Sequence, residues 1–376
     1  MSNNSTTFHI DLTQLKRNWK WLDSKTHRHC RTASVVKANA YGHGMQAVAT
    51  SLFEAGCRIF CVARLEEAIA LRSIIASDNN ASELAEIICF DGLQDGGLAD
   101  YRAYNLIPAL KQLSEIKDAN KFAHKSGENV PVWIQLDTGM NRLGISKAEL
   151  SFLSIGNKSV SLSGLDIRAV MSHLSSSDNP SHHTNEQHHA RFTQMSTQFA
   201  RLPRSLSASH GILLSDKFHF DITRPGIALY GYSDNPVAEF GCKPILKWTA
   251  PILQVRFINA GEQIGYGADF TASTPMRIAT IGAGYADGYR RSLQKIGKIN
   301  VAGYICNSVG RISMDSLVID VSHIPETKLA NISQVCLLGA HYTAADMACD
   351  VSTISYEILT SLGTRPKRVY EEKVII

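Results

Sequence analysis

The sequence lacks any run of the about 20 consecutive apolar residues that a membrane-spanning helix needs. It also lacks a strong excess of either charge, because 38 basic residues stand against 34 acidic ones and the formal net charge is +4. The basic residues are scattered rather than gathered in the stripe that a nucleic-acid-binding face requires. We therefore expect neither a membrane-spanning protein nor a nucleic-acid-binding one.

A secretory signal is also missing, because the N-terminal residues show no basic cap followed by an apolar run. The eight cysteines lack the spacing of a structural zinc site: only Cys57 and Cys61 lie close together, with three residues between them. We interpret the cysteines as reduced thiols of a core. With 44% hydrophobic and 19% charged residues, the composition is that of a globular protein, which we expect in the cytoplasm.

Short apolar runs alternate with helical patterns through the first two thirds of the sequence. Most runs lack strict alternation, which is typical of strands buried on both faces of a parallel sheet. Eight strand-and-helix repeats favour a closed (β/α)8 barrel over residues 1–241, and a doubly wound open sheet is the alternative that periodicity does not exclude. Strands are predicted at Ser34–Ala38, Ile59–Ala63, Ile87–Phe90, Ile107–Leu110, Pro131–Asp137, Ile167–His173, Ser205–Ser209 and Ile222–Tyr230, and helices at Met45–Ala55, Leu65–Ala76, Lys147–Ser154 and Glu186–Ala200.

The pattern of apolar and polar residues changes after about Gly241. Clusters of Gly, Pro, Asn and Ser separate apolar runs, and few helical patterns intervene before Asp346–Leu362. This pattern predicts a second, mainly β domain over residues 242–376, so that the fold class is α/β with an N-terminal barrel and a C-terminal mainly β domain. The runs are Ala250–Phe257, Arg277–Ile281, Leu317–Val321 and Gln334–Leu338.

A lysine, Lys37, follows two β-branched residues in the first predicted strand. Burying an ammonium costs several kcal/mol unless the group is paired or neutralised. At the C-terminal end of a barrel strand, such a lysine lies where barrel enzymes have their catalytic groups. Desolvation lowers the pKa of an amine and makes it a better nucleophile toward a carbonyl carbon. Position alone leaves open a lysine that simply reaches solvent.

The residues around Lys37, positions 35–44, read VVKANAYGHG and resemble the cofactor-attachment motif of the alanine racemase family. The resemblance continues along nearly the whole chain, with at least six motifs in the family's order. It implies that Lys37 forms an internal aldimine with pyridoxal 5′-phosphate and acts as one catalytic base. It also implies that Tyr41 hydrogen-bonds the phosphate of this cofactor.

Four more segments resemble cofactor-binding motifs of the family: MSHL at 171–174, SAS at 207–209, ITRPGIALYG at 222–231 and SYE at 355–357. By this resemblance, a histidine lies beside the pyridine ring, an arginine bonds the ring nitrogen, and a serine, two amides and a tyrosine lie at the phosphate. The implied cofactor-binding residues, besides Lys37 and Tyr41, are His173, Ser209, Arg224, Gly226, Ile227 and Tyr356.

The arginine at position 224 has a chemical consequence of its own. Arginine keeps its proton at any working pH, so it does not protonate the ring nitrogen as a carboxylic acid would. The ring is then a weaker electron sink. Fewer stray protonations at the cofactor carbon follow, which favours racemisation over transamination.

The substrate side of the resemblance lies in LDTGMNRLG at 136–144, IGYGA at 264–268, GYADG at 284–288 and GRISMD at 310–315. Racemisation requires a proton acceptor on each face of the α-carbon, and Lys37 with Tyr266 would meet this need. In the family the tyrosine comes from a partner subunit, so the resemblance implies a homodimer with shared active sites. The other implied roles are substrate and cofactor contacts at Arg142, substrate binding at Met314 and a channel gate at Tyr285.

One position departs from the family pattern. Where many members carry a carbamylated lysine that contacts the equivalent of Arg142, this sequence has Gln135. A glutamine carbonyl accepts a hydrogen bond but supplies no negative charge. We therefore predict no carbamate at this position.

The resemblance predicts an isomerase that interconverts L- and D-alanine for peptidoglycan precursors, without a metal ion. A racemase of broader specificity, acting on serine or other amino acids, is the nearest alternative. A non-catalytic cofactor carrier would not need Tyr266 or Arg224, and a decarboxylase is expected to use an acid at the ring nitrogen. The histidines near residues 182–189 lack helical metal-binding spacing, and we expect a surface loop there.

Overall fold

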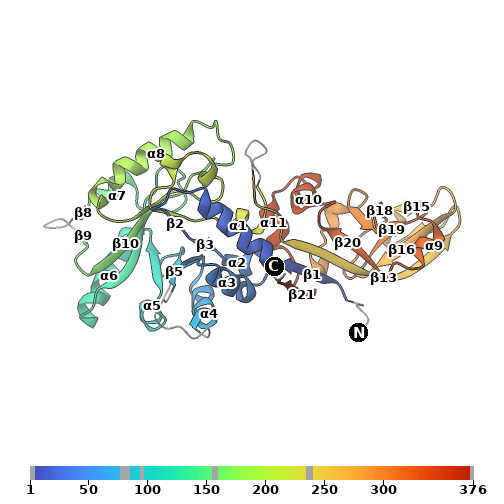
Figure 1. The fold of residues 1–376 in the computed structure, drawn as a ribbon, viewed down its shortest axis with the longest axis horizontal. Helices are drawn as coiled ribbons and strands as arrows, with labels where there is room; N and C mark the ends of the chain where they lie inside the picture. Colours follow the sequence, from blue (N-terminus) through green and yellow to red (C-terminus); the bar gives the residue numbers. More distant parts are fainter. Residues whose placement is uncertain (1–4, 77–84, 94–96, 155–159, 234–239, 373–376) are drawn as a thin grey trace. The chain divides into compact units, whose positions relative to one another are not determined.

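The computed structural model describes residues 5–76, 85–93, 97–154, 160–233 and 240–372 (Figure 1). Within these residues, no helix is both long enough and apolar enough to cross a membrane. The chain forms two compact units. We call them the barrel unit, Leu15–Ala40 with Met45–Cys242, and the β unit, Met1–Gln14 with Tyr41–Gly44 and Lys243–Ile376.

Short parallel strands form the centre of the barrel unit, in the order β11-β10-β7-β6-β5-β4-β3. The pairing continues beyond both ends of this order. β12 (Ile222–Thr223) pairs in parallel with β2 (Arg31–Thr32), which directly precedes β3, and a parallel bridge joins Arg224 to Ala208 beyond β11. The sheet therefore closes on itself, which confirms the predicted fold class and excludes the open sheet. The strands are β3 (Ser34–Val35), β4 (Ile59–Val62), β5 (Glu86–Cys89), β6 (Ile107–Leu110), β7 (Val130–Gln135), β10 (Leu165–Met171) and β11 (Arg204–Ser205).

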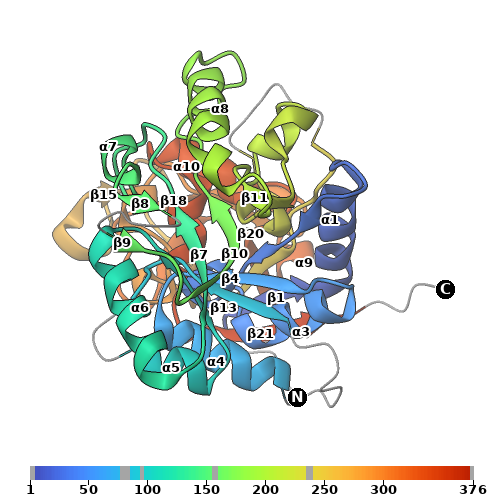
Figure 2. The same cartoon turned by 90° about the vertical axis from the view of Figure 1, so that its left-hand side faces the viewer.

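Helices connect these strands, and Figure 2 shows α4, α5 and α6 outside the strands. α4 (Leu65–Ala76) has the predicted bounds, and α3 (Met45–Glu54) is one residue shorter than predicted. The predicted helix Lys147–Ser154 ends at Leu150, and Leu153–Ser154 form a short strand, β8, with β9 (Val160–Ser161). The remaining helices are α1 (Leu12–Ser24), α5 (Leu98–Ala103), α6 (Leu113–Ser126) and α8 (Thr184–Met195), the last followed by the 3-10 turn η1 (Ser196–Phe199).

Three predicted strands are longer than the observed ones, because turns interrupt them. The first strand ends at Val35, and α2 (Lys37–Tyr41) is a turn whose central residues have positive φ angles. The last predicted strand stops at Thr223, because Pro225 has no N–H to donate to a ladder, and Ile227–Tyr230 form the 3-10 turn η4. The strand predicted at Ser205–Ser209 is reduced to β11.

The β unit contains a closed antiparallel barrel. Its strands follow the order β16-β19-β18-β17-β20-β13, and β13 also pairs with β16, which closes the circle. β1 (Thr7–Asp11) pairs with β13, and β21 (Lys367–Glu371) pairs in parallel with β1. The domain boundaries predicted from the sequence assign residues 5–14 to the barrel domain instead. The strands are β13 (Leu246–Ile258), β16 (Met276–Ile281), β17 (Lys298–Val301), β18 (Tyr304–Val309), β19 (Leu317–Asp320) and β20 (Gln334–Leu338).

A cluster of aromatic rings forms part of the core of the β unit. The ring of Trp248 lies 5.1 Å from that of Phe8 and 5.8 Å from that of Tyr289, both in edge-to-face geometry. Aromatic pairs of this kind contribute beyond their buried area. The helical segment predicted at Asp346–Leu362 is two helices, α10 (Ala344–Asp350) and α11 (Ser355–Thr360).

Candidate active site

Lys37 lies at the C-terminal end of β3, where barrel enzymes place their chemistry. Its side chain is half-buried, and its amine makes no hydrogen bond or ion pair with any residue that the structure describes. Burial lowers the pKa of this amine, and the positive charge of Arg142 lowers it further. A larger share of neutral amine is therefore available to attack a carbonyl carbon.

The turn after Lys37 is left-handed, with φ angles of 51°, 53°, 54° and 53° at residues 38–41. A left-handed conformation costs about 1–2 kcal/mol for each residue with a side chain. The turn is held by hydrogen bonds: the Ala40 N–H donates to Val36 O at 2.9 Å, and the Met45 N–H donates to Asn39 Oδ1 at 2.8 Å. Such strain persists where the surrounding contacts over-determine the backbone, as is typical of functional sites.

Arg224 is 3% exposed and has no carboxylate partner in the described part of the chain. Its guanidinium donates to Ser172 O at 2.6 Å and to Ser205 Oγ, both neutral acceptors. Burial lowers its pKa to about 10, so it stays charged at neutral pH. The structure thus places an uncompensated cation in the barrel, as suits a neutral ring nitrogen rather than one that takes a proton.

His173 follows β10, and its side chain is half-buried. Burial lowers its pKa to about 3, together with the positive charges of Arg224, Arg142 and Lys37. At any working pH the imidazole is therefore neutral, with one nitrogen that donates a hydrogen bond and one that accepts. His188 is buried on α8, which corrects the expectation of a surface loop for this histidine.

Ser209 and the turn after β12 form a set of hydrogen-bond donors. Ser209 Oγ accepts the N–H groups of Gly226 at 2.9 Å and Ala228 at 3.2 Å, which leaves its own proton to donate elsewhere. The N–H of Ile227 makes no hydrogen bond within the described residues. A hydroxyl and an amide donor suit a phosphate group.

Arg142 lies on an exposed loop that buried groups hold in place. Asp137 Oδ1 accepts the Gly139 N–H at 2.8 Å, and Thr138 Oγ1 lies 2.8 Å from Ser172 Oγ. The carbonyl oxygen of the same Ser172 accepts a hydrogen bond from Arg224. A continuous hydrogen-bonded path therefore joins the Arg142 loop to the buried arginine.

Gln135, the residue that departs from the family pattern, also supports this loop. Its side chain is buried and its Nε2 donates to Leu143 O at 3.1 Å. Arg142 makes no hydrogen bond with it among the described residues. The glutamine thus has a structural role, and the absence of a carbamate stays a prediction.

Tyr266 and Tyr285 of the β unit line one cavity of about 590 Å³, with Arg291, Arg311 and Ser313 in the same wall. Both tyrosines are exposed in the single chain, by 72% and 46%. Tyr266 begins a 3-10 turn, η5 (Tyr266–Ala268), between Gly265 and Gly267, which have φ angles of 74° and 73°. Glycine adopts this backbone without the strain that a Cβ would bring.

Backbone hydrogen bonds connect the segments around Tyr285 and Met314. The Tyr285 N–H donates to Ser313 O and the Ala286 N–H to Met314 O, each at 3.1 Å. Arg365 donates to the buried carboxylate of Asp287 at 3.0 and 3.1 Å and to Asp315 at 2.7 Å. The predicted gate at Tyr285 and the predicted substrate-binding residue Met314 are therefore adjacent. In the same unit the rings of Tyr41 and Tyr356 lie 6.0 Å apart.

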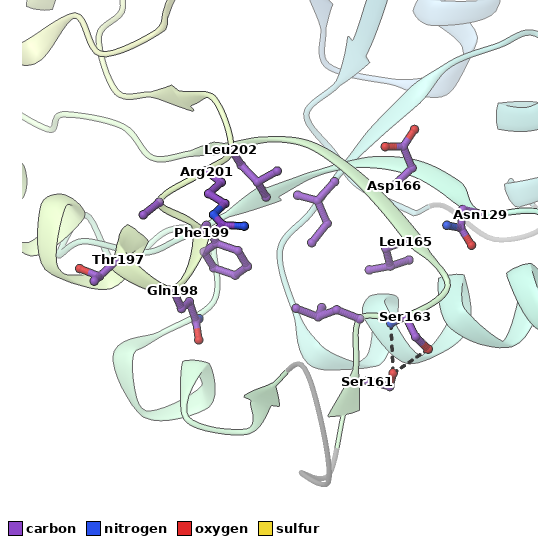
Figure 3. Close-up of a pocket in the computed structure, with 13 residues that line it drawn as sticks. Asn129, Ser161, Ser163, Leu165, Asp166, Thr197, Gln198, Phe199, Arg201 and Leu202 are labelled. Atoms are coloured by element: carbon purple, nitrogen blue, oxygen red, sulfur yellow. Dashed lines mark hydrogen bonds between the residues drawn. The ribbon is translucent and has the colours of Figure 1, made fainter.

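A larger cavity, of about 910 Å³, lies elsewhere in the barrel unit (Figure 3). It is lined by Leu165 and Asp166, at the N-terminal end of β10, and by Phe199 and Leu202 before β11. The predicted site residue His173 follows the opposite end of β10, and no predicted site residue lines this cavity. Cavity volume alone does not locate the candidate active site.

The structure divides the predicted site residues between the two units. Lys37, Arg142, His173, Ser209, Arg224, Gly226 and Ile227 belong to the barrel unit, and Tyr41, Tyr266, Tyr285, Met314 and Tyr356 to the β unit. Sequence reasoning missed the supporting residues Glu67, Thr138, Ser172 and Ser205. Thr138 and Ser172 lie inside motifs that carry the resemblance. Their supporting role becomes visible only from the residues that they contact in the structure.

The donor set of the barrel unit fits pyridoxal 5′-phosphate. An amine of lowered pKa suits the aldehyde of this cofactor, and the Ser209–Ile227 donors suit its phosphate. Arg224, with neutral partners, suits its ring nitrogen.

Comparisons with known proteins agree with this fit. A family model described as "Alanine racemase, N-terminal domain" matches residues 10–234, and one described as "Alanine racemase, C-terminal domain" matches residues 245–370. The catabolic alanine racemase of Agrobacterium fabrum is 41% identical over 361 residues, which are 96% of this chain and 91% of that relative. The alanine racemase of Cereibacter sphaeroides is 39% identical over 368 residues, 97% of each chain.

A solved structure adds the cofactor. The crystal structure of alanine racemase from Bartonella henselae, with covalently bound pyridoxal phosphate, matches with a TM-score of 0.90 at 35% identity and covers 98% of this chain and 99% of that one. The predicted resemblance is confirmed by sequence and fold alike. The chain belongs to the alanine racemase family.

Proposed function

We propose that this protein is an isomerase that interconverts L- and D-alanine with pyridoxal 5′-phosphate as its cofactor. One observation carries the proposal: among the described residues, the barrel unit combines a half-buried lysine of lowered pKa that has no partner with a buried arginine whose partners are all neutral. The decarboxylase alternative requires an acid at the ring nitrogen, and the acceptors of Arg224 among the described residues are two carbonyls and a hydroxyl. The supply of D-alanine for peptidoglycan and a location in the cytoplasm stay predictions.

Each residue of the barrel unit has a task in this proposal. The cofactor, when bound, withdraws electrons from the α-carbon of the amino acid and makes its proton easier to remove. The Ser209 hydroxyl, which accepts the N–H of Gly226, and the Ile227 amide would hold the phosphate, and Arg224 would donate to the ring nitrogen without protonating it. Arg142 presents its planar guanidinium to the carboxylate of the amino acid.

Two groups move the proton. Lys37 removes or returns it on one face of the α-carbon, and Tyr266 does so on the other. The phenol of Tyr266 needs a hydrogen-bonding partner to act as a base near neutral pH. His173 can take this part because its low pKa keeps it neutral, so that one ring nitrogen accepts a hydrogen bond while the other donates one.

The active enzyme, in this proposal, is a homodimer in which Tyr266 acts on the substrate of the partner subunit. Support comes from the exposure of Tyr266 and Met314, 72% and 51% in the single chain, since covering a site expels water and strengthens the electrostatic interactions inside it. β13 also exposes Leu253, Val255 and Phe257. Exposed apolar groups of this kind mark association surfaces.

Purified protein with L-alanine in deuterated water tests the activity. We expect loss of optical rotation together with replacement of the α-proton by deuterium, and we expect Lys37→Ala to abolish both. Lys295→Ala, a change of a lysine in the β unit, is the control and should leave both rates unchanged. An unaltered rate in Lys37→Ala would contradict the proposal.

Mixed dimers test the shared site. Lys37→Ala and Tyr266→Phe subunits are each inactive in this proposal, but a mixed dimer contains one intact site if the tyrosine serves the partner. Random reassociation makes about half of the dimers mixed, so about a quarter of the wild-type activity should return. No recovery in dimers that have exchanged subunits would show that each subunit supplies both bases to its own site.

A further inference from the structure

Glu67, in the first turn of α4, connects the ends of two neighbouring barrel strands. Its Oε1 accepts the N–H of Ala38 at 2.6 Å. Its Oε2 accepts the N–H groups of Ala63 at 2.9 Å and Arg64 at 3.2 Å. Ala38 follows β3 and the other two residues follow β4, and these strands pair in parallel. One carboxylate thus joins the two loops at the C-terminal edge of the sheet.

The Ala38 amide is the first peptide group after Lys37, and it opens the left-handed turn. The Ala38 nitrogen is bonded to the carbonyl carbon of Lys37, so a hydrogen bond to it fixes the peptide plane that follows the lysine. Ala38, Asn39 and Ala40 carry side chains and would leave the left-handed region if released. The hydrogen bond from Glu67 therefore holds the backbone on which the direction of the lysine side chain depends.

Glu67 is also one of the charges near the lysine amine. Burial and Arg142 lower the pKa of Lys37, whereas Glu67, followed by Asp91 and Cys61, raises it. The negative charge of Glu67 thus opposes the effect of Arg142.

His173, which follows β10, is a further titratable group, and the charge of Lys37 acts on it. It is neutral above about pH 3 and adds no charge to this balance at working pH. Arg142, on its loop, and Glu67, on α4, therefore act on the amine with opposite sign.

We propose that Glu67 is a positioning residue for Lys37: its carboxylate holds the Ala38 amide so that the left-handed turn directs the lysine, and its charge offsets that of Arg142. The proposal rests on the proposed function in that Lys37 is taken as the catalytic base. The two effects separate by substitution. Glu67→Gln keeps the size of the side chain and removes its charge, whereas Glu67→Ala removes both the charge and the acceptor.

The test measures the lysine itself, without turnover. The full chain, freed of cofactor, is labelled with acetic anhydride over a range of pH, and mass spectrometry follows the reactivity of Lys37 against that of the surface lysines. We expect the midpoint for Lys37 to move to lower pH in Glu67→Gln. Glu66→Gln, which changes the exposed neighbour on the same helix, is the matched control and should leave the midpoint where it is.

A second measurement, the rate of covalent cofactor attachment, tests whether Glu67 holds the left-handed turn. At equal fractions of neutral Lys37, we expect pyridoxal phosphate to attach covalently to Glu67→Ala about tenfold or more slowly than to wild type, because a hydrogen bond to a charged acceptor is lost. Glu67→Gln, which keeps one amide acceptor, should recover part of this rate.

Clear outcomes decide the proposal. It is overturned if both Glu67 variants label Lys37 with the wild-type midpoint, even when their thermal stability falls, because that pattern is purely structural. A failure of the proposed function looks different: the wild-type chain would then attach no cofactor and racemise no alanine, while the labelling midpoints would still report on Glu67. If Glu67→Ala does not fold, the comparison of Glu67→Gln with Glu66→Gln decides.

Discussion

The two units differ in how much of the candidate site's environment a single chain provides. In the barrel unit, Arg224 and Ser172 are 3% and 2% exposed and bond one another, and burial strongly shifts the pKa of His173. In the β unit, Tyr266 and Tyr285 line an open cavity and are largely exposed. The barrel unit is therefore preorganised by its own fold, while the tyrosines of the β unit acquire a dry environment only when another surface covers them.

The largest effect that tests this contrast is expected at Tyr266. Tyr266→Phe removes one hydroxyl and should lower racemisation by about 10²–10⁴-fold, the usual contribution of a general base. Racemisation has an equilibrium constant of one, so kcat/KM falls equally in both directions, but exchange of the α-proton should fall more for the enantiomer whose proton tyrosine removes. Deuterium incorporation from L-alanine and from D-alanine, measured separately, reports this asymmetry.

Tyr304→Phe provides the control, since it makes the same change in the β unit away from the cavity. Equal rates in Tyr266→Phe and Tyr304→Phe would show that the exposed phenol has no part in the reaction, and the β unit would then contribute only structure.

A smaller effect is expected in the barrel unit at the hydroxyl pair of Thr138 and Ser172, which lies 2.8 Å apart. Ser172 Oγ donates to Leu136 O, so the proton between the two hydroxyls belongs to Thr138. Thr138→Val removes this bond, worth about 1 kcal/mol, and should raise KM for alanine about fivefold by loosening the Arg142 loop. Steady-state kinetics measures the change.

Thr138→Ser keeps the hydroxyl and should restore the wild-type KM. If both variants behave alike, the bond does not position the loop, and the preorganisation of the barrel unit would not extend to Arg142.

A still smaller effect is expected in the β unit at Arg365, which joins Asp287 and Asp315 beside the gate. Arg365→Lys cannot reproduce the bidentate contact with Asp287. We expect a modest rise in KM with little change in kcat, because the gate and the Met314 segment lie outside the proton-transfer groups.

Arg256→Lys, an exposed arginine on β13, is the matched control for charge and chemistry. A fall in kcat with unchanged KM in Arg365→Lys would show that the segments around Tyr285 and Met314 act on the chemical step instead.

The strands of the barrel were predictable because buried parallel strands are short apolar runs, as Ile107–Leu110 illustrates. Pairing between distant segments was not: nothing local in Thr7–Asp11 indicates that it pairs with residues 246–249. The left-handed turn was also hidden, because Ala38-Asn39-Ala40 contains no glycine to signal positive φ.

The site itself was predicted by resemblance for the residues that would touch cofactor or substrate. Its supports were not, since Glu67 lies thirty residues beyond Lys37 and meets Ala38 only because two strands are neighbours. A carboxylate in the first turn of a helix is common, and its usual role is to cap that helix. The second role becomes visible only in three dimensions.

The smallest expected shift concerns pH. His173 has a pKa of about 3 in the folded chain, well below the value near 6.5 of a free histidine, because burial and the nearby cations disfavour its charged form. The proton is therefore absent above about pH 3, and the pH profile of kcat/KM near neutrality should contain no step from this group. His173→Asn should then lower the rate at every pH while leaving the midpoints of the profile in place. A midpoint near pH 6.5 that vanishes in this variant would instead mean that His173 is hydrated and takes up a proton, so that the barrel unit is as open as the β unit.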